Sequence, residues 1–340
     1  MSSSQKDNPL ISVVAPIYNE ERNVVPLVER LSEVFDKLRL DWELVLALDP
    51  CADQTEERIL EMIQANFPIR LIKFSRRFGK PISLMAGLRH CLGDATIVID
   101  SDLQDPPELI GTMIEKWREG SFVVIAQRTT RRGENFFYLK AAELFYWVLD
   151  KFSEVRVPRN TGDFRLLDKR VVDELCRINE RHGFLRGLTA LAGFKTTIIP
   201  FEREPRLTGK TQISVFGAVG IALDGIIPFS KAPIRMVMAL GAGIFSVGIV
   251  ATILWAIYGF ARGFGYNWLL FGLFPFGWTF FGVSISCLGL VGEYVLRCYE
   301  DSRDRPLYIV DALVESAKLS RKLSTAEVNA QAFSNKKGLT

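Results

Sequence analysis

The chain is poor in the residues that build several common kinds of site. It has only two histidines, His90 and His182, and neither stands in a Cys/His cluster, so a zinc site is not expected. Its five cysteines are scattered and odd in number, which indicates free thiols in a reducing compartment. Neither GxGxxG nor a Walker A loop occurs, which argues against a dinucleotide oxidoreductase and a P-loop NTPase. The net charge of +3 is too small to indicate nucleic-acid binding.

The first part of the chain alternates between short apolar segments and segments with helical periodicity. This alternation predicts an α/β fold, with a Rossmann-like, mostly parallel sheet covered by helices on both faces. Ligands bind such sheets beyond the carboxyl ends of the strands. The expected strands are 11–17, 43–48, 70–74, 95–99 and 122–126, and the expected helices are 21–39, 54–66, 80–92 and 106–118.

Three polar clusters follow three of these strands: 16–20, 49–53 and 100–105. Asp100 and Asp102 point to the same side of an extended chain, where two carboxylates repel unless a cation lies between them. A hard divalent cation such as Mg²⁺ or Mn²⁺ is the usual partner. The convergence of the clusters therefore predicts a nucleotide and metal site. The alternative is an acidic strand-to-helix loop in which Asp105 caps the next helix.

Two long apolar runs occupy the last third of the chain. Residues 234–260 carry one charge, Arg235, and residues 268–296 carry one charge, Glu293. Each run exceeds the roughly 20 residues that cross a bilayer, so we expect transmembrane helices at 233–260 and 268–296, with a pair of buried core helices as the alternative. The short linker makes them a hairpin. Flanking arginines and lysines place both termini in the cytoplasm, which predicts a multi-pass protein of the cell inner membrane.

The remaining segments are assigned by composition. Basic and aromatic residues beyond residue 128 indicate contact with lipid headgroups. We expect a first domain over 1–210, an amphipathic membrane-interface segment over 211–232 and a cytosolic C-terminal tail over 297–340. Gly241, Gly243 and the glycines of the second span permit close approach of helices, which favours a homo-oligomer.

The sequence resembles the polyprenyl-phosphate glycosyltransferases of family 2, which include the bactoprenol glucosyltransferases and dolichyl-phosphate mannose synthase. The resemblance covers roughly residues 9–311 and is most specific in the acidic motif, the GDFRL segment and the two-span hairpin. The matching motifs are Pro16-x-Tyr18-Asn19-Glu20, Phe78-Gly79-Lys80, Gly93-Asp94, Asp100-x-Asp102-Leu103-Gln104-Asp105-Pro106-Pro107-Glu108, Gly162-Asp163-Phe164-Arg165-Leu166, Phe184-Leu185-Arg186-Gly187, Gly193-Phe194 and Arg305-Pro306-x-Tyr308.

The resemblance implies a GT-A domain over 1–210 that transfers a sugar, expected to be glucose, from a UDP-sugar donor to polyprenyl (undecaprenyl) phosphate. It implies inversion at the anomeric carbon and dependence on Mg²⁺ or Mn²⁺. The implied metal ligands are Asp100, Asp102 and Gln104. The implied nucleotide-binding residues are Pro16, Tyr18, Glu20, Asp49, Lys80, Asp100 and Ser101. The implied catalytic and acceptor-binding residues are Asp163, Asp102, Arg128, Arg132, Arg206 and Lys210. An ion pair with an arginine is the alternative role for Asp163.

Two segments depart from the family pattern. Relatives carry two acids and Gly-Ser where this chain has Asp49-Pro50-Cys51-Ala52-Asp53, and the basic residue near Gly209 is displaced. These departures keep a non-catalytic, membrane-anchored nucleotide-sugar binder open, as well as a transferase for mannose or an amino-sugar. A processive polysaccharide synthase is disfavoured because Gln-x-x-Arg-Trp is absent. Two spans also make a poor transporter.

Overall fold

The computed structural model describes residues 8–129, 158, 161–178, 185–202, 232–263, 267–303 and 305–319. The chain divides into two compact units. The first unit holds a β-sheet and its covering helices, and the second holds two long helices.

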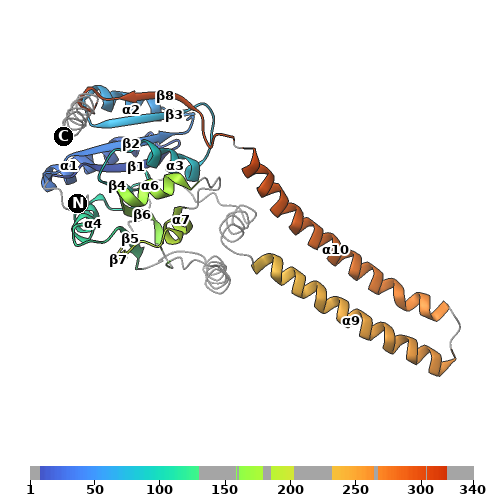
Figure 1. Cartoon of the computed structure of the whole chain (residues 1–340). Helices are drawn as coiled ribbons and strands as arrows, with labels where there is room; N and C mark the ends of the chain where they lie inside the picture. The colour runs from blue at the N-terminus through green and yellow to red at the C-terminus, as the bar shows by residue number, and fades with distance from the viewer. Residues whose placement is uncertain are drawn as a thin grey trace, which may run out of the picture. The chain divides into compact units, whose positions relative to one another are not determined.

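The first unit is built on one eight-stranded sheet in the order β7-β5-β6-β4-β1-β2-β3-β8 (Figure 1). Four of its seven strand pairings are parallel, and the antiparallel ones join β6 to β4 and β5, and β8 to β3. The α/β prediction is confirmed, although the sheet is more mixed than expected. The strands are β1 (Ile11–Ile17), β2 (Trp42–Leu48), β3 (Ile69–Phe74), β4 (Ala95–Val98), β5 (Val123–Arg128), β6 (Thr161–Asp168), β7 (Thr196–Phe201) and β8 (Val310–Glu315).

The centre of the sheet contains a topological switch point. Strand β1 pairs with β2 on one side and with β4 on the other, so the chain turns in opposite directions after β1 and after β3. Loops at the carboxyl ends of such neighbouring strands diverge and leave room for a ligand. The three expected polar clusters lie at the ends of β1, β2 and β4, on this carboxyl edge of the sheet.

Helices cover the sheet at nearly the positions that the periodicity predicts. The predicted helix at 106–118 begins as a 3₁₀ turn whose N-cap residue is Pro106, one position later than the expected cap at Asp105. The helices are α1 (Val24–Leu38), α2 (Thr55–Gln64), α3 (Lys80–His90), η2 (Pro107–Leu109), α4 (Ile110–Arg118), α6 (Lys169–Arg177) and α7 (Leu185–Leu191).

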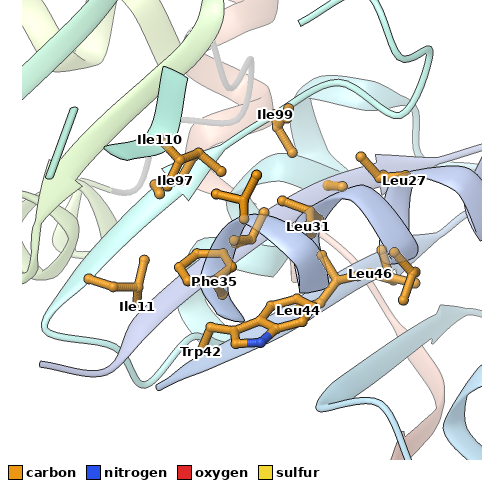
Figure 2. Packing of buried hydrophobic residues seen from close by; sticks show 14 of the residues in the cluster. Ile11, Leu27, Leu31, Phe35, Trp42, Leu44, Leu46, Ile97, Ile99 and Ile110 are labelled. Atoms are coloured by element: carbon orange, nitrogen blue, oxygen red, sulfur yellow. The ribbon is translucent and has the colours of Figure 1, made fainter. Parts of the chain in front are cut away.

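The core lies between the sheet and its helices. Leu27, Leu31 and Phe35 of α1 are buried against residues of the central strands (Figure 2). The Phe35 and Trp42 rings stack with centroids 5.0 Å apart, and such a pair adds about 0.5–1.5 kcal/mol beyond simple burial. Strands β1 and β2 are buried along their whole length, as expected for strands covered on both faces.

The second unit consists of helices α9 (Ala232–Arg262) and α10 (Asn267–Ser302), which lie side by side (Figure 1). They fall where the two membrane spans were expected. Among the described residues, no helix meets the combined requirement of length and apolar character for crossing a membrane.

Strand β8 is a feature that the sequence did not predict. The region 297–340 was expected to be a cytosolic tail, but α10 continues to Ser302 and β8 then joins the sheet beside β3 (Figure 1). Three of its six residues are exposed and none is buried, so its own sequence carries little of the apolar signal of a buried strand. Its pairing with β3 makes it part of the first unit.

Candidate active site

The loops after β1 and β2 are tied together at the carboxyl edge. The Asn19 N–H donates to Cys51 Sγ at 3.1 Å, and the Ala52 N–H donates to Asn19 Oδ1 at 2.9 Å. Asn19 has a φ of +53°, a conformation that asparagine tolerates better than most residues. The Glu20 N–H donates to Thr55 Oγ1 at 2.8 Å. Two of the three polar clusters therefore meet, as their positions after neighbouring strands predict.

Asp49, at the end of β2, organises the loop that leads from β3 to α3. It is only 3% exposed. Its two carboxylate oxygens accept the N–H groups of Phe78 and Gly79, each at 2.9 Å. Charge-assisted hydrogen bonds of this kind are stronger than neutral ones, so Asp49 holds the loop firmly. Any contact between Asp49 and a nucleotide base shares the carboxylate with this loop.

The acidic loop after β4 is held against β1. Ser101 Oγ donates to the Pro16 carbonyl at 3.1 Å, and the Gln104 N–H donates to Asp102 Oδ1 at 3.2 Å. Leu103 between them has a φ of +58°, a conformation that costs a non-glycine residue free energy. Asp100, Asp102 and Gln104 therefore all lie within one short turn, which spans residues 100–104.

Lys80 joins the acidic loop to the GDFRL segment. Strands β4 and β6 are antiparallel with Val98 opposite Arg165, and the same register continued by two residues places Asp100 opposite Asp163. Lys80 Nζ lies 2.7 Å from Asp100 Oδ1 and 3.1 Å from Asp163 Oδ2. The first residue of α3 thus bridges two carboxylates that would otherwise repel each other.

Asp163 has a second cationic partner. Arg186 Nε, from α7, lies 3.0 Å from Asp163 Oδ1. The alternative expected for Asp163, an ion pair with a neighbouring arginine, is therefore the arrangement present. Burial alone would raise the pKa of Asp163, but Arg186 and Lys80 outweigh it and hold the pKa well below the ordinary value. A carboxylate with so low a pKa is a poor general base.

Burial affects the pKa values of two nearby cations, Lys80 and Arg165, with different outcomes. Burial opposes the charge on Lys80, but Asp100 and Asp163 overcome it and raise its pKa. Arg165 is 1% exposed, and its guanidinium donates to the backbone carbonyls of Gly162 and Asp163. Burial lowers the pKa of Arg165 to about 10, so it stays protonated at neutral pH. We call Lys80, Asp100, Asp163 and Arg186 the ion-pair cluster.

Arg128 lies at the end of β5, next to this cluster. A Cβ added to Gly162 would stand 3.0 Å from Arg128 Nη2, so the guanidinium packs directly against the glycine. Glycine at this position of the GDFRL segment therefore makes room for Arg128. Arg132, Arg206 and Lys210, the other residues expected to bind the acceptor, lie outside the described residues.

Tyr18 and Glu20, two of the expected nucleotide-binding residues, lie in the loop after β1. The Arg77 guanidinium lies over the Tyr18 ring at 3.9 Å, and its Nη1 is 3.3 Å from Tyr18 Oη. Glu20 Oε2 accepts a 2.6 Å hydrogen bond from Asn23 Nδ2. The β1 and β3 loops thus approach each other at this edge.

Several residues of the matching motifs have contacts that the sequence did not predict. Arg186 was noticed as part of Phe184-Leu185-Arg186-Gly187, but nothing local relates it to Asp163. Asp49 was expected to contact the base, and its structural role in the β3–α3 loop was not foreseen. Gly93 and Asp94 serve the opposite edge: the Asp94 N–H donates to the Leu10 carbonyl, and Gly93 donates to Ser12 Oγ.

The donor set after β4 suits a hard divalent cation, because it combines carboxylate and amide oxygens. Asp100 Oδ1 is buried and accepts no hydrogen bond from the described residues, although Lys80 Nζ stands beside it. The described part of the chain has no group of three or more His, Cys, Asp and Glu side chains placed to hold a metal. If a metal binds at this edge, its oxygen ligands would be Asp102 and Gln104, with Asp100 shared with Lys80.

Comparison with known proteins identifies the family of the chain. The family model described as "Glycosyl transferase family 2" matches residues 12–176. A glycosyltransferase of Synechocystis sp. is 39% identical over 306 residues, which cover 89% of this chain and 95% of that protein. The bactoprenol glucosyl transferase of Shigella phage SfV is 34% identical over 304 residues, which cover 88% of this chain and 97% of that protein.

Solved structures match part of this chain at lower sequence identity. Glucosyl-3-phosphoglycerate synthase from Mycobacterium tuberculosis, solved with Mn²⁺, UDP-glucose and phosphoglyceric acid, is 20% identical, with a TM-score of 0.45 over 66% of this chain and 82% of that one. The sheet, its loops and the sequence relatives together define a glycosyltransferase with a GT-A fold. The chain belongs to glycosyltransferase family 2.

Proposed function

We propose that this enzyme transfers glucose from UDP-glucose to a polyprenyl phosphate such as undecaprenyl phosphate. The observation that carries the proposal is the ion-pair cluster at the switch point of the sheet, where Lys80 joins Asp100 to Asp163. The 34% identity to a bactoprenol glucosyl transferase over nearly its whole length supports this choice of sugar and acceptor.

The reaction asks for little proton transfer. An oxygen of the acceptor phosphate attacks the anomeric carbon, the bond from that carbon to the diphosphate breaks, and UDP leaves with the electron pair. Because the phosphate is already an oxyanion near neutral pH, it needs positioning more than a base. This agrees with Asp163, whose pKa is lowered and whose role here is to hold Lys80 and Arg186. A single displacement of this kind inverts the anomeric carbon.

The leaving diphosphate and the acceptor both need positive charge. A divalent cation held by Asp102 and Gln104, with Asp100, would stabilise the charge that develops on the diphosphate. We assign the acceptor phosphate to Arg128, with Arg132, Arg206 and Lys210 as further candidates, because guanidinium groups pair with phosphate oxygens in a bidentate way. Pro16, Tyr18, Glu20, Asp49 and Ser101 line the proposed nucleotide side.

We further propose that the α9–α10 hairpin anchors the enzyme in the inner membrane, with the sheet in the cytoplasm. Residues 236–261 carry no charge. Several apolar side chains of the hairpin are exposed, including Phe260 at 92% and Leu288 at 74%. An apolar surface of this size is unusual in contact with water and is typical of a membrane or protein interface. Extraction from cell membranes by detergent but not by alkaline carbonate would support the anchor; release by carbonate would refute it.

The transfer is tested with undecaprenyl phosphate in detergent and a panel of radiolabelled UDP- and GDP-sugars, with Mg²⁺ or Mn²⁺. We expect a labelled lipid from UDP-glucose that is lost in EDTA. Labelling from another donor alone, such as GDP-mannose, would replace glucose in the proposal. UDP binding without transfer from any donor would favour a non-catalytic nucleotide-sugar binder, which the departure at Asp49 to Asp53 leaves open.

A further inference from the structure

The segment that follows α10 pairs with the first unit, which holds the sheet and the proposed active site and is called the catalytic unit from here on. Strand β8 pairs antiparallel with β3, and hydrogen bonds continue beyond both ends of the ladder. The Ser75 N–H donates to the Ile309 carbonyl at 3.1 Å, and the Ser316 N–H donates to the Ile69 carbonyl at 3.0 Å. Arg70 of β3, which is 5% exposed, forms a 2.8 Å ion pair with Glu315. The segment therefore belongs to the fold of the catalytic unit.

A row of aromatic rings leads from this segment toward the active site. The Tyr308 ring packs edge-on against Phe74 with centroids 5.7 Å apart, and Phe74 packs edge-on against Phe78, also at 5.7 Å. Phe74 is the last residue of β3 and is 1% exposed. Tyr308 also reaches α3, where its Oη lies 3.5 Å from His90 Nδ1. Tyr308 thus touches both elements that flank the β3–α3 loop.

Phe78 lies two residues before Lys80 in that loop. Its N–H and that of Gly79 are held by Asp49. Gly79, with a φ of +86°, turns the chain into α3. The next residue is Lys80, which bridges Asp100 and Asp163. The loop is therefore fixed on one side by Asp49 and on the other by the rings of Phe74 and Tyr308.

We propose that Tyr308 is a positioning residue for sugar transfer. It acts through Phe74 and Phe78 on the β3–α3 loop and so sets the place of Lys80 in the ion-pair cluster. This inference rests on the proposed function, because it assigns Tyr308 a part in that reaction. Small misplacements of a catalytic group can reduce rates by about a hundredfold, and a loop displaced by the loss of one ring contact should cost about tenfold in kcat.

The test compares full-length variants in detergent by kcat, donor KM, UDP affinity and thermal midpoint. Tyr308→Phe keeps the ring contact with Phe74 and should transfer sugar like the wild type, whereas Tyr308→Ala should lose about tenfold in kcat. Val314→Ala is the matched control, because Val314 lies on β8 and packs against the core but lies outside the row of rings. It should lower the thermal midpoint and leave kcat unchanged.

A double-mutant cycle tests the route through the rings. If Tyr308 acts through Phe78, then Phe78→Leu should reproduce the loss of kcat, and the double variant should lose little more than either single variant. A Tyr308→Ala variant with wild-type kcat, or with no greater loss than Val314→Ala, would overturn the proposal. If Tyr308→Ala does not fold, an unchanged kcat in Phe78→Leu would overturn it as well.

If the proposed function is wrong, the wild type itself will transfer no sugar from any donor, and this result differs from a failure of the positioning role of Tyr308. In that event UDP affinity still tests the positioning role, because the loop and Asp49 lie on the proposed nucleotide side. Weaker UDP binding in Tyr308→Ala than in Val314→Ala would support positioning of the loop, and equal binding would refute it.

Discussion

Replacing Lys80 by methionine should destabilise the catalytic unit and do so most strongly at neutral pH. Lys80 Nζ lies 2.7 Å from Asp100 Oδ1 and 3.1 Å from Asp163 Oδ2. One such pair has a Coulomb energy of about 4 kcal/mol at 4 Å and an effective dielectric constant of 20. The lysine side chain is 43% exposed and Arg186 still pairs with Asp163, so we discount the loss to about 2 kcal/mol.

The pKa shifts of Asp163 and Lys80 determine how the loss of stability in Lys80→Met changes with pH. The lowered pKa of Asp163 makes its contribution complete above its ordinary pKa of 3.8, and the contribution is lost only as the pH falls through the lowered value. The raised pKa of Lys80 makes its contribution complete below its ordinary pKa of 10.5. Both contributions are therefore whole at pH 7.5 in the wild type. In Lys80→Met the two carboxylates repel each other at pH 7.5, and any proton that the pair takes up as the pH falls relieves this repulsion.

The assay is thermal unfolding in detergent at pH 7.5 and pH 4.5. A loss of about 2 kcal/mol corresponds to about 4–8 °C for a unit of this size. The difference between wild type and variant should be smaller at pH 4.5. The control is Lys73→Met, which breaks a surface pair with Glu56 at 2.7 Å and should cost at most about 1 kcal/mol. A Lys80→Met deficit that is no larger than that of the control, or that grows at pH 4.5, would refute the reasoning.

Three further predictions concern other residues of the site. Asp49→Asn sets an amide NH₂ against one of two N–H donors and should cost about 1–3 kcal/mol, seen as a lower thermal midpoint and a higher UDP-glucose KM. Arg186→Leu removes a cation beside Asp163 and should lower kcat by about tenfold or more, with partial recovery in Arg186→Lys. Gly162→Ala should displace the Arg128 guanidinium and raise the KM for polyprenyl phosphate; an equal rise in donor KM would contradict this assignment.

Much of the first unit was predictable because its signals are local. Strand β1 occupies 11–17 as predicted, and the polar clusters after β1, β2 and β4 meet because parallel strands end on one edge. Strand β8 was missed because none of its residues is buried and because its partner, β3, lies more than 200 residues earlier in the chain.

The inner arrangement of the site was less accessible to sequence reasoning. The acidic pair predicts a metal between the carboxylates, but nothing in the sequence indicated that Lys80 reaches both Asp100 and Asp163, which lies on β6 far along the chain. The second cationic partner of Asp163 is Arg186 on α7, and no spacing rule relates these two residues. Such contacts depend on the register between β4 and β6, which the sequence pattern leaves open.

The most direct test of the proposed chemistry is transfer of radiolabel from UDP-glucose to undecaprenyl phosphate by wild type and by Asp102→Ala, with and without EDTA. Asp102 lies on the acidic loop beside the ion-pair cluster and is assigned to the metal. We predict a labelled lipid in the wild type that is lost in EDTA, and a decrease of at least about a hundredfold in Asp102→Ala. Transfer by Asp102→Ala at the wild-type rate would contradict the assignment of the reaction to this site.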